Sequence, residues 1–300
     1  MNFTPQRDAR PQPSTAKLIT AFAAIYLLWG STYLAIHFAV ETLPPFLMAG
    51  TRHLVAGAVL YPLARLRNGE RLTRANWSAA FLMGALLLFG GNGGVSWAEK
   101  IVPSGVAALL VATVPLWMVL FDWLRPGGLR PTGRVVIGLF LGFAGVAFLV
   151  GPSKLAGGGR VDPIGATVLI LASLSWAAGS VFSRHLPLPR SPLLGTAMQC
   201  FIGGALLIVV GLLAGQGSAL RWESVSLRSV LALGYLIMFG SLLGFSAYIW
   251  LLGVAPPARV STYAYVNPVV ALVLAGRWRA SRSRCACWWP RRSSSPRWCW

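Results

Sequence analysis

The chain of 300 residues is poor in charge and nearly lacks acidic side chains. Charged residues make up 11% of it, with 7 Asp and Glu against 26 Lys and Arg, and the mean hydropathy is +0.65. A water-soluble fold of this size would lack the polar side chains needed to cover its surface. We therefore expect a polytopic membrane protein, whose net charge of +19 needs no nucleic-acid partner to explain it.

Cysteines and catalytic motifs are also scarce. Of the 4 cysteines, Cys200 lies inside an apolar stretch, and Cys285, Cys287 and Cys299 fall near the C-terminus. Cys285-Ala-Cys287 lacks the second ligand pair of a structural zinc site, so we expect no metal and no other cofactor. The apolar stretches contain no HExxH, paired aspartates or Ser/His arrangement, which argues against an intramembrane enzyme. A channel is disfavoured because no filter-like loop or ring of charges is present.

What the chain has instead is a series of apolar stretches, each about as long as a bilayer is thick. A helix needs about 20 apolar residues to cross ~30 Å of hydrocarbon. We predict nine membrane helices, at residues 18–38, 45–64, 77–97, 103–124, 134–151, 163–183, 193–214, 229–252 and 257–276. The first is too long for a removable signal peptide and is expected to be a retained anchor.

The basic residues predict how this series is oriented. With the N-terminus in the cytoplasm, thirteen Lys and Arg fall on cytoplasmic segments and only five on outer ones, namely Lys100, Lys154, Arg160, Arg221 and Arg228. Lys and Arg are enriched in cytoplasmic loops. The sequence therefore predicts a bacterial-type inner membrane protein in which residues 1–16 form a cytoplasmic tail.

The composition changes abruptly after Gly276. Residues 277–300 read RWRASRSRCACWWPRRSSSPRWCW and contain no Leu, Val, Ile, Gly or Phe. The segment is a basic tail that binds anionic lipid, a Cys/Trp-rich metal or redox segment, or the product of a shifted reading frame. One GC-rich back-translation, read from the third base of the Gly276 codon, gives ALAGEPLTLRMLVAAAVILAAVVL, which is a helix end, a Gly-Glu turn and a new apolar span. We favour the frameshift, in which an aberrant tail replaces a tenth helix.

The chain also matches itself. Three matches lie at nearly one offset: Trp29 with Trp176, Gly84 with Gly234, and Pro115 with Pro268, at 147, 150 and 153 residues. Matches at one offset indicate a duplication. Because five helices per half is an odd number, the second half enters the membrane in the opposite sense, as in many secondary transporters. The predicted fold is all-α, with an inverted repeat of halves 17–151 and 162–276.

Two segments resemble a known family. The run WGSTYLAIHFAVETLPPFLMAGTRHLVAG at residues 29–57 resembles the opening of the EamA branch of the drug/metabolite transporter superfamily. The run YAYVNPVVAL at 263–272 is similar to the ninth helix of that family. The resemblance covers residues 17–276 and implies ten helices in two EamA repeats, cytoplasmic termini and gradient-coupled movement of small metabolites, often outward. The family continues through a Gly-Glu turn into a tenth helix, which this chain replaces.

Polar and aromatic side chains inside the apolar stretches form the candidate substrate site, because such groups are costly in lipid. The predicted substrate-binding residues are Trp29, Ser31, Thr32, Tyr33, Asn92, Trp97, Trp176, Tyr263 and Asn267. Asn92 lies in a GGNGG run, whose glycines permit close backbone approach. The alternatives are interfacial anchoring or packing for the first-helix group and Trp176, and an interhelical hydrogen bond for Asn92.

Arg52, His53 and His37 are the candidates for charge recognition or proton linkage. Arg52 and His53 lie about eight residues into the second apolar stretch, where an unpaired charge costs at least ~2.5 kcal/mol. Arg52 either neutralises a substrate carboxylate or pairs with Glu41 or Glu99. Histidine is the residue type that changes its charge most readily in the physiological pH range, so proton linkage is one hypothesis for both histidines, and a neutral packing role is the stronger alternative.

Pro115 and Pro268, at matching places in the two halves, are predicted helix breaks or hinges because each frees a backbone carbonyl. Inherited kinks are the alternative. Taken together, the sequence predicts a secondary active transporter that exports amino acids or other small metabolites by alternating access. Its partners are a small-molecule substrate and the lipid bilayer, and both a monomer and a homodimer remain open. The alternative is an inactive, frameshifted product that inserts but cannot complete its bundle.

Overall fold

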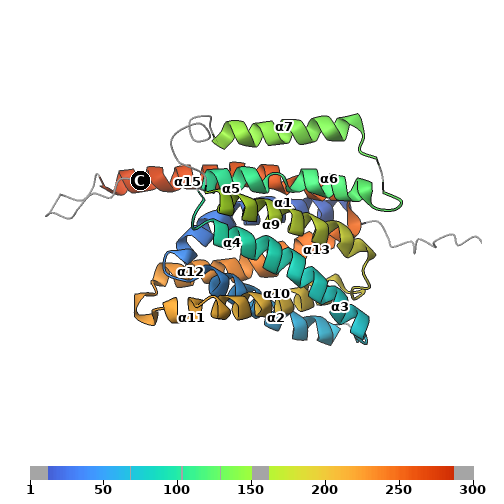
Figure 1. The fold of residues 1–300 in the computed structure, drawn as a ribbon, viewed down its shortest axis with the longest axis horizontal. Helices are drawn as coiled ribbons and strands as arrows, with labels where there is room; N and C mark the ends of the chain where they lie inside the picture. Colours follow the sequence, from blue (N-terminus) through green and yellow to red (C-terminus); the bar gives the residue numbers. More distant parts are fainter. Residues whose placement is uncertain (1–12, 68, 103, 129, 151–161, 287–300) are drawn as a thin grey trace, which may run out of the picture.

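The computed structural model describes residues 13–67, 69–102, 104–128, 130–150 and 162–286, and every regular element within these ranges is helical. The helices run side by side in one bundle (Figure 1). Seven segments are long and apolar enough to cross a membrane: Thr15–Val40, Pro45–Arg67, Arg74–Ala98, Val106–Leu124, Pro163–His185, Pro192–Leu213 and Leu227–Val254. Gly133–Phe148 is a shorter apolar helix. The chain is thus an all-α polytopic membrane protein.

The first half follows the predicted spans, with two interruptions. Its elements are α1 (Thr15–Val40), α2 (Pro45–Arg67), α3 (Arg74–Met83), the π-helix η1 (Gly84–Gly93), α4 (Gly94–Ala98), α5 (Ser104–Val111), α6 (Val114–Leu124) and α7 (Gly133–Val150). The third span is continuous but π-helical in its middle. The fourth span, predicted as one helix, is divided by a turn at Ala112 and Thr113 into α5 and α6.

The second half repeats the π-helical interruption. Its elements are α9 (Pro163–Phe182), the 3₁₀ turn η2 (Ser183–His185), α10 (Pro192–Leu213), α11 (Gln216–Ala219), the 3₁₀ turn η3 (Trp222–Ser224), α12 (Leu227–Tyr235), the π-helix η4 (Leu236–Phe245), α13 (Ser246–Val254), α14 (Pro257–Val260) and α15 (Tyr263–Ala286). The π-helices η1 and η4 each have 10 residues and lie in corresponding spans. Because π-helices are rare and are found frequently at functional sites, this pair supports both the duplication and a site nearby.

Local capping fixes several helix starts. The Asp162 carboxylate accepts a hydrogen bond from the Gly165 amide at 2.8 Å, and Pro163 occupies the first turn of α9. A capping box between Thr73 and Asn76 begins α3. These groups satisfy amides that have no partner within the helix.

The contact between α2 and α10 carries the signature of an inverted repeat. At the offset of 147 residues, Gly57 matches Gly204 and Leu54 matches Phe201. A Cβ atom at Gly57 would lie 2.5 Å from the backbone nitrogen of Phe201, and one at Gly204 would clash with the backbone nitrogen of Leu54. Each contact becomes the other when the halves are exchanged, as two-fold symmetry requires. The pseudo-two-fold axis therefore passes between α2 and α10, which lie side by side in Figure 1.

The two halves also interlock around this axis. The π-helix η1 packs on α9 and α10 of the second half, and η4 packs on α1 and α2 of the first. In the same way α6 packs on α9, and α15 packs on α1. Helices from both halves therefore enclose the centre of the bundle.

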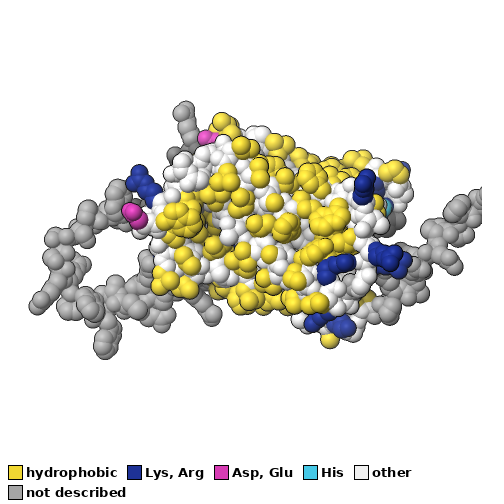
Figure 2. Space-filling model, turned by 90° about the horizontal axis from the view of Figure 1, so that it is seen from below, with side chains coloured by type: hydrophobic (Ala, Val, Ile, Leu, Met, Phe, Trp, Pro, Cys, Tyr) yellow, Lys and Arg dark blue, Asp and Glu magenta, His cyan; other side chains and the backbone are white. Residues whose placement is uncertain are grey.

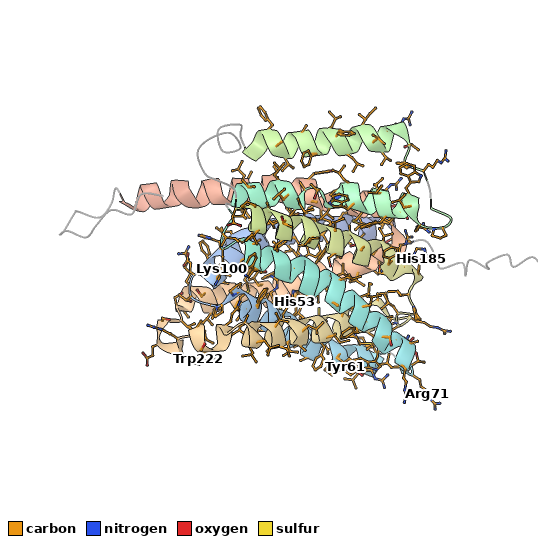
Figure 3. The ribbon with its side chains drawn as sticks, viewed as in Figure 1. His53, Tyr61, Arg71, Lys100, His185 and Trp222 are labelled. Carbon is orange, nitrogen blue, oxygen red and sulfur yellow. The ribbon has the colours of Figure 1, made fainter. Side chains whose placement is uncertain are left out.

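The surface has an apolar middle and polar ends. Figure 2 shows hydrophobic side chains across the middle of one face and Lys and Arg gathered at one end. Arg71 and His185 lie at that end, and Lys100 and Trp222 lie at the opposite one (Figure 3). Phe140 and Phe148 of α7 are 65% and 83% exposed, as expected of side chains that face lipid. This distribution fits a bundle that spans a bilayer.

The predicted end of the ninth helix at Gly276 was wrong. α15 continues through RWRASRSRCA to Ala286, because this run contains no Gly or Pro and Ala and Arg are among the strongest helix formers. Figure 1 shows α15 extending past the ends of its neighbours. The remainder of the predicted aberrant tail, 287–300, lies outside the described residues, so the frameshift stays a prediction.

We expect restoration of the alternative frame after Gly276 to raise folding yield and transport together. Val269, Leu272 and Val273 of α15 are 47%, 52% and 53% exposed, and a tenth apolar helix would cover such faces. The measurement compares membrane expression, detergent-stable yield and efflux of the chain as it stands, the frame-restored chain and a chain stopped after Gly276. Equal behaviour of the first two would show that the present tail is native.

Candidate functional site

A cavity of about 100 Å³ lies between the two halves of the bundle. Its walls come from α1, α2, η1, α4, α5, α6, α9, η4 and α15. The structure brings together these predicted site residues around it: Trp29, Thr32, Tyr33, Arg52, His53, Asn92, Trp176, Tyr263 and Asn267. His53 lies within the bundle, away from both ends (Figure 3).

Arg52 is the cation of this cavity. It is 5% exposed, and its Nε donates to Nε2 of His53 at 3.2 Å. Nδ1 of His53 lies 3.3 Å from Oγ of Ser241 on η4. Among the described residues, Nη1 of Arg52 is buried without a hydrogen-bond partner. Because a buried cation is stabilised by an anion that accepts its hydrogen bonds, this guanidinium is suited to a carboxylate ligand.

Glu99 is the acidic residue whose charge interacts with that of Arg52. Glu41, the other acid considered from the sequence, lies 3.5 Å from Arg228 instead. Glu99 follows α4 directly, and burial raises the pKa of its carboxyl to about 7 although Arg52 opposes the rise. Because burial favours the protonated, uncharged form of this carboxyl, Glu99 is a weak counter-ion for Arg52.

Asn92 supplies a second unpartnered polar atom. Its Oδ1 is buried without a hydrogen-bond partner among the described residues, and the side chain lines the cavity from η1. A Cβ atom at the preceding Gly91 would lie 2.8 Å from the Trp176 ring. The glycine therefore lets the indole approach the π-helix, and the Asn92 carbonyl is available to a donor on a ligand.

Four rings form an aromatic cluster: Trp29, Trp176 and Tyr263 line the cavity, and Tyr248 packs against them. The Trp29 ring centre lies 5.0 Å from those of Tyr248 and Tyr263 and 5.7 Å from that of Trp176. Nε1 of Trp29 donates to the Gly240 carbonyl at 3.1 Å, and Nε1 of Trp176 donates to the Tyr248 hydroxyl at 2.9 Å. These bonds fix the rings in place. Tyr248 was missed in the sequence, where the available signal was a phenol that needs a partner inside an apolar span.

The two prolines and Asn267 have different surroundings. Pro115 is the second residue of α6, directly after the turn that divides the fourth span. α15 continues through Pro268. In the amide orientation that satisfies its neighbours, the Asn267 nitrogen donates to the carbonyls of Tyr263 at 3.1 Å and Tyr26 at 3.2 Å. Asn267 therefore also joins α15 to α1.

Three predicted residues lie away from the cavity. The Ser31 hydroxyl lies 2.6 Å from that of Tyr235 and joins α1 to α12. Trp97 packs in an apolar cluster. His37 is 4.0 Å from Glu41 at the exposed end of α1. In the part of the chain that the structure describes, no group of three or more His, Cys, Asp or Glu could hold a metal ion.

Comparison with known proteins places this architecture among transporters. The EamA-like transporter family matches residues 16–151 and 163–281. "Uncharacterized inner membrane transporter YedA" of Escherichia coli K12 is 40% identical over 259 residues, which cover 86% of this chain and 81% of the relative. "Probable amino-acid metabolite efflux pump" of the same strain is 26% identical over 265 residues, covering 84% and 83%. One crystal structure has a TM-score of 0.67 at 27% identity and covers 86% of this chain and 88% of its own.

Proposed function

Because the chain belongs to the EamA-like transporter family, we propose that it exports amino acids or closely related small metabolites by secondary active, alternating-access transport. It is a multi-pass inner membrane transporter. One relative is named as a probable amino-acid metabolite efflux pump, which supports the substrate class. The proposal also places the N-terminus and the Arg71 end in the cytoplasm, since Lys and Arg gather there.

The observation that carries this proposal is the buried guanidinium of Arg52 facing a cavity with Nη1 unpartnered. A substrate carboxylate would accept from Nη1 and offset the cost of burying the cation. The cavity volume of about 100 Å³ suits a small metabolite.

The aromatic cluster supplies the complementary site for an ammonium group. A cation over the face of Trp or Tyr gains about 0.5 to 2 kcal/mol, the larger values when water is excluded. Trp29, Trp176 and Tyr263 line the same cavity as Arg52. A zwitterion with its carboxylate at Arg52 and its ammonium group over the rings would interact favourably with both parts of the cavity.

The test measures efflux from bacterial cells preloaded with dipeptides, which the cells hydrolyse to amino acids. Cells that express the chain, and cells that express the frame-restored version, should release one or a few amino acids faster than cells with an empty vector. Mass spectrometry of the medium identifies the substrate. Equal release of all twenty amino acids by the three strains would contradict the proposed function.

A further inference from the structure

α2 and α10 align without a gap. PFLMAGTRHLVAGAVL at 45–60 aligns with PLLGTAMQCFIGGALL at 192–207, at the 147-residue offset that also pairs Trp29 with Trp176. Both helices begin at a proline. In this register Arg52 corresponds to Gln199.

The packing supports this register. Gly57 approaches the backbone of Phe201, and its mate Gly204 approaches that of Leu54, so the two helices cross near Leu54 and Phe201. Arg52 precedes this crossing on α2, and Gln199 precedes it on α10. Because the helices are antiparallel mates, the two side chains lie on opposite sides of the pseudo-two-fold axis.

Gln199 is a buried amide whose polar atoms have no partner. It is 0% exposed, and among the described residues neither Oε1 nor Nε2 makes a hydrogen bond. Leaving a buried polar group without a hydrogen-bond partner destabilises the folded state. Such a group in a native structure calls for an explanation, and a ligand that reaches it in another conformation is one.

We infer that Gln199 is the substrate-contacting counterpart of Arg52 in the oppositely facing conformation. This inference rests on the proposed alternating access. When the halves of an inverted repeat exchange conformations, α10 takes the surroundings that α2 has in the other state. The Gln199 amide then lines the cavity on the side of the Arg71 end and exchanges hydrogen bonds with the substrate.

Because Gln199 is neutral and Arg52 is charged, the two residues should bind a carboxylate substrate with different affinities. An amide donates to a carboxylate without bringing a charge, whereas a guanidinium adds a charge-assisted bond about twice as strong. Substrates that carry a carboxylate should therefore bind more weakly at the Gln199 side than at the Arg52 side.

The test is the accessibility of single cysteines to a charged, membrane-impermeant methanethiosulfonate. Gln199→Cys and Arg52→Cys are each made in a chain in which Cys200 is replaced by Ala and the tail cysteines by Ser. Gln199→Cys should be modified in inverted vesicles, which expose the cytoplasmic side, and Arg52→Cys in spheroplasts, which expose the outer side. Leu207→Cys, also 0% exposed on α10, is the control and should react in neither preparation.

The outcomes separate this inference from the proposed function. If Gln199→Cys reacts no faster than Leu207→Cys in inverted vesicles, the inference is wrong, whatever Arg52→Cys does. The proposed function stands or fails separately, on the efflux measurement. Reaction of Gln199→Cys only from the outer side also overturns the inference, because it places the residue on the wrong face.

A second variant tests the role without labelling. Gln199→Leu removes the unpartnered amide, so it should raise the melting temperature in detergent while lowering efflux by about tenfold or more, the loss of roughly one hydrogen bond to a charged group. A glutamine with a purely structural role would lose stability and efflux together. That result, or unchanged efflux, would contradict the inference.

Discussion

Arg52→Gln should lower the rate of amino-acid efflux about 100-fold, because losing a buried, hydrogen-bonded charge partner costs about 2–5 kcal/mol and each 1.4 kcal/mol is a factor of ten. Folding should survive. The wild-type guanidinium is buried with Nη1 unpartnered, and a neutral side chain there relieves part of the burial cost. The measurement is the initial efflux rate normalised to membrane expression, together with the melting temperature in detergent.

Two variants control for general effects of charge. Lys100→Gln removes an exposed cation outside the cavity, in the loop that follows α4 at the end opposite Arg71. It should leave efflux within about twofold, since surface charges contribute little. Arg52→Lys keeps the charge but loses the planar guanidinium that forms two hydrogen bonds with a carboxylate. Its efflux rate should therefore lie between those of Arg52→Gln and Lys100→Gln. Arg52→Gln with normal efflux would show that this cation does not bind the substrate.

Gly57→Ala should prevent α2 and α10 from packing. The added Cβ would lie 2.5 Å from the backbone nitrogen of Phe201 and 2.9 Å from the backbone oxygen of Ala197. Neither backbone atom can swing away, so the helices must move apart on either side of the pseudo-two-fold axis. Overpacking of this kind costs about 1–3 kcal/mol or more. We expect a lower melting temperature, a lower detergent-stable yield and lost efflux.

The matched control is another glycine-to-alanine change within a helix. A Cβ at Gly234 of α12 meets nothing within 4 Å, so Gly234→Ala should gain up to about 1 kcal/mol from helix propensity. Gly204→Ala, the symmetry mate of Gly57→Ala, should be as damaging as its partner. Equal stability of Gly57→Ala and Gly234→Ala would refute the close packing.

The membrane helices could be predicted because they depend on the local sequence. The length of an apolar run decides whether it spans a bilayer, and α2 and α10 begin within a residue of the predicted positions. The turn at Ala112 and Thr113 gave no comparable signal, since the apolar run continues through it. The extension of α15 past Gly276 was missed for the opposite reason: hydropathy falls there, but helix propensity does not.

The residues of the candidate site could be predicted where a polar side chain lies in an apolar run, because exposing such a side chain to lipid is energetically unfavourable. Arg52 and Asn92 are polar groups in apolar runs, and the structure places both on the cavity. The same signal could not separate them from Ser31, whose hydroxyl bonds to Tyr235 on another helix. Gln199 was overlooked because its meaning comes from its symmetry mate and its missing partners, which only the packed bundle shows.

The most direct test of the account asks whether the transporter recognises a carboxylate through Arg52. Purified protein in liposomes loaded with the exported amino acid takes up the labelled compound by exchange, and unlabelled competitors are added outside. The amino acid should compete strongly and its carboxamide, which keeps the side chain and the ammonium group but lacks the carboxylate, should compete at least tenfold more weakly. Arg52→Gln should abolish that difference. Equal competition by the acid and the amide against the wild-type protein would contradict the account.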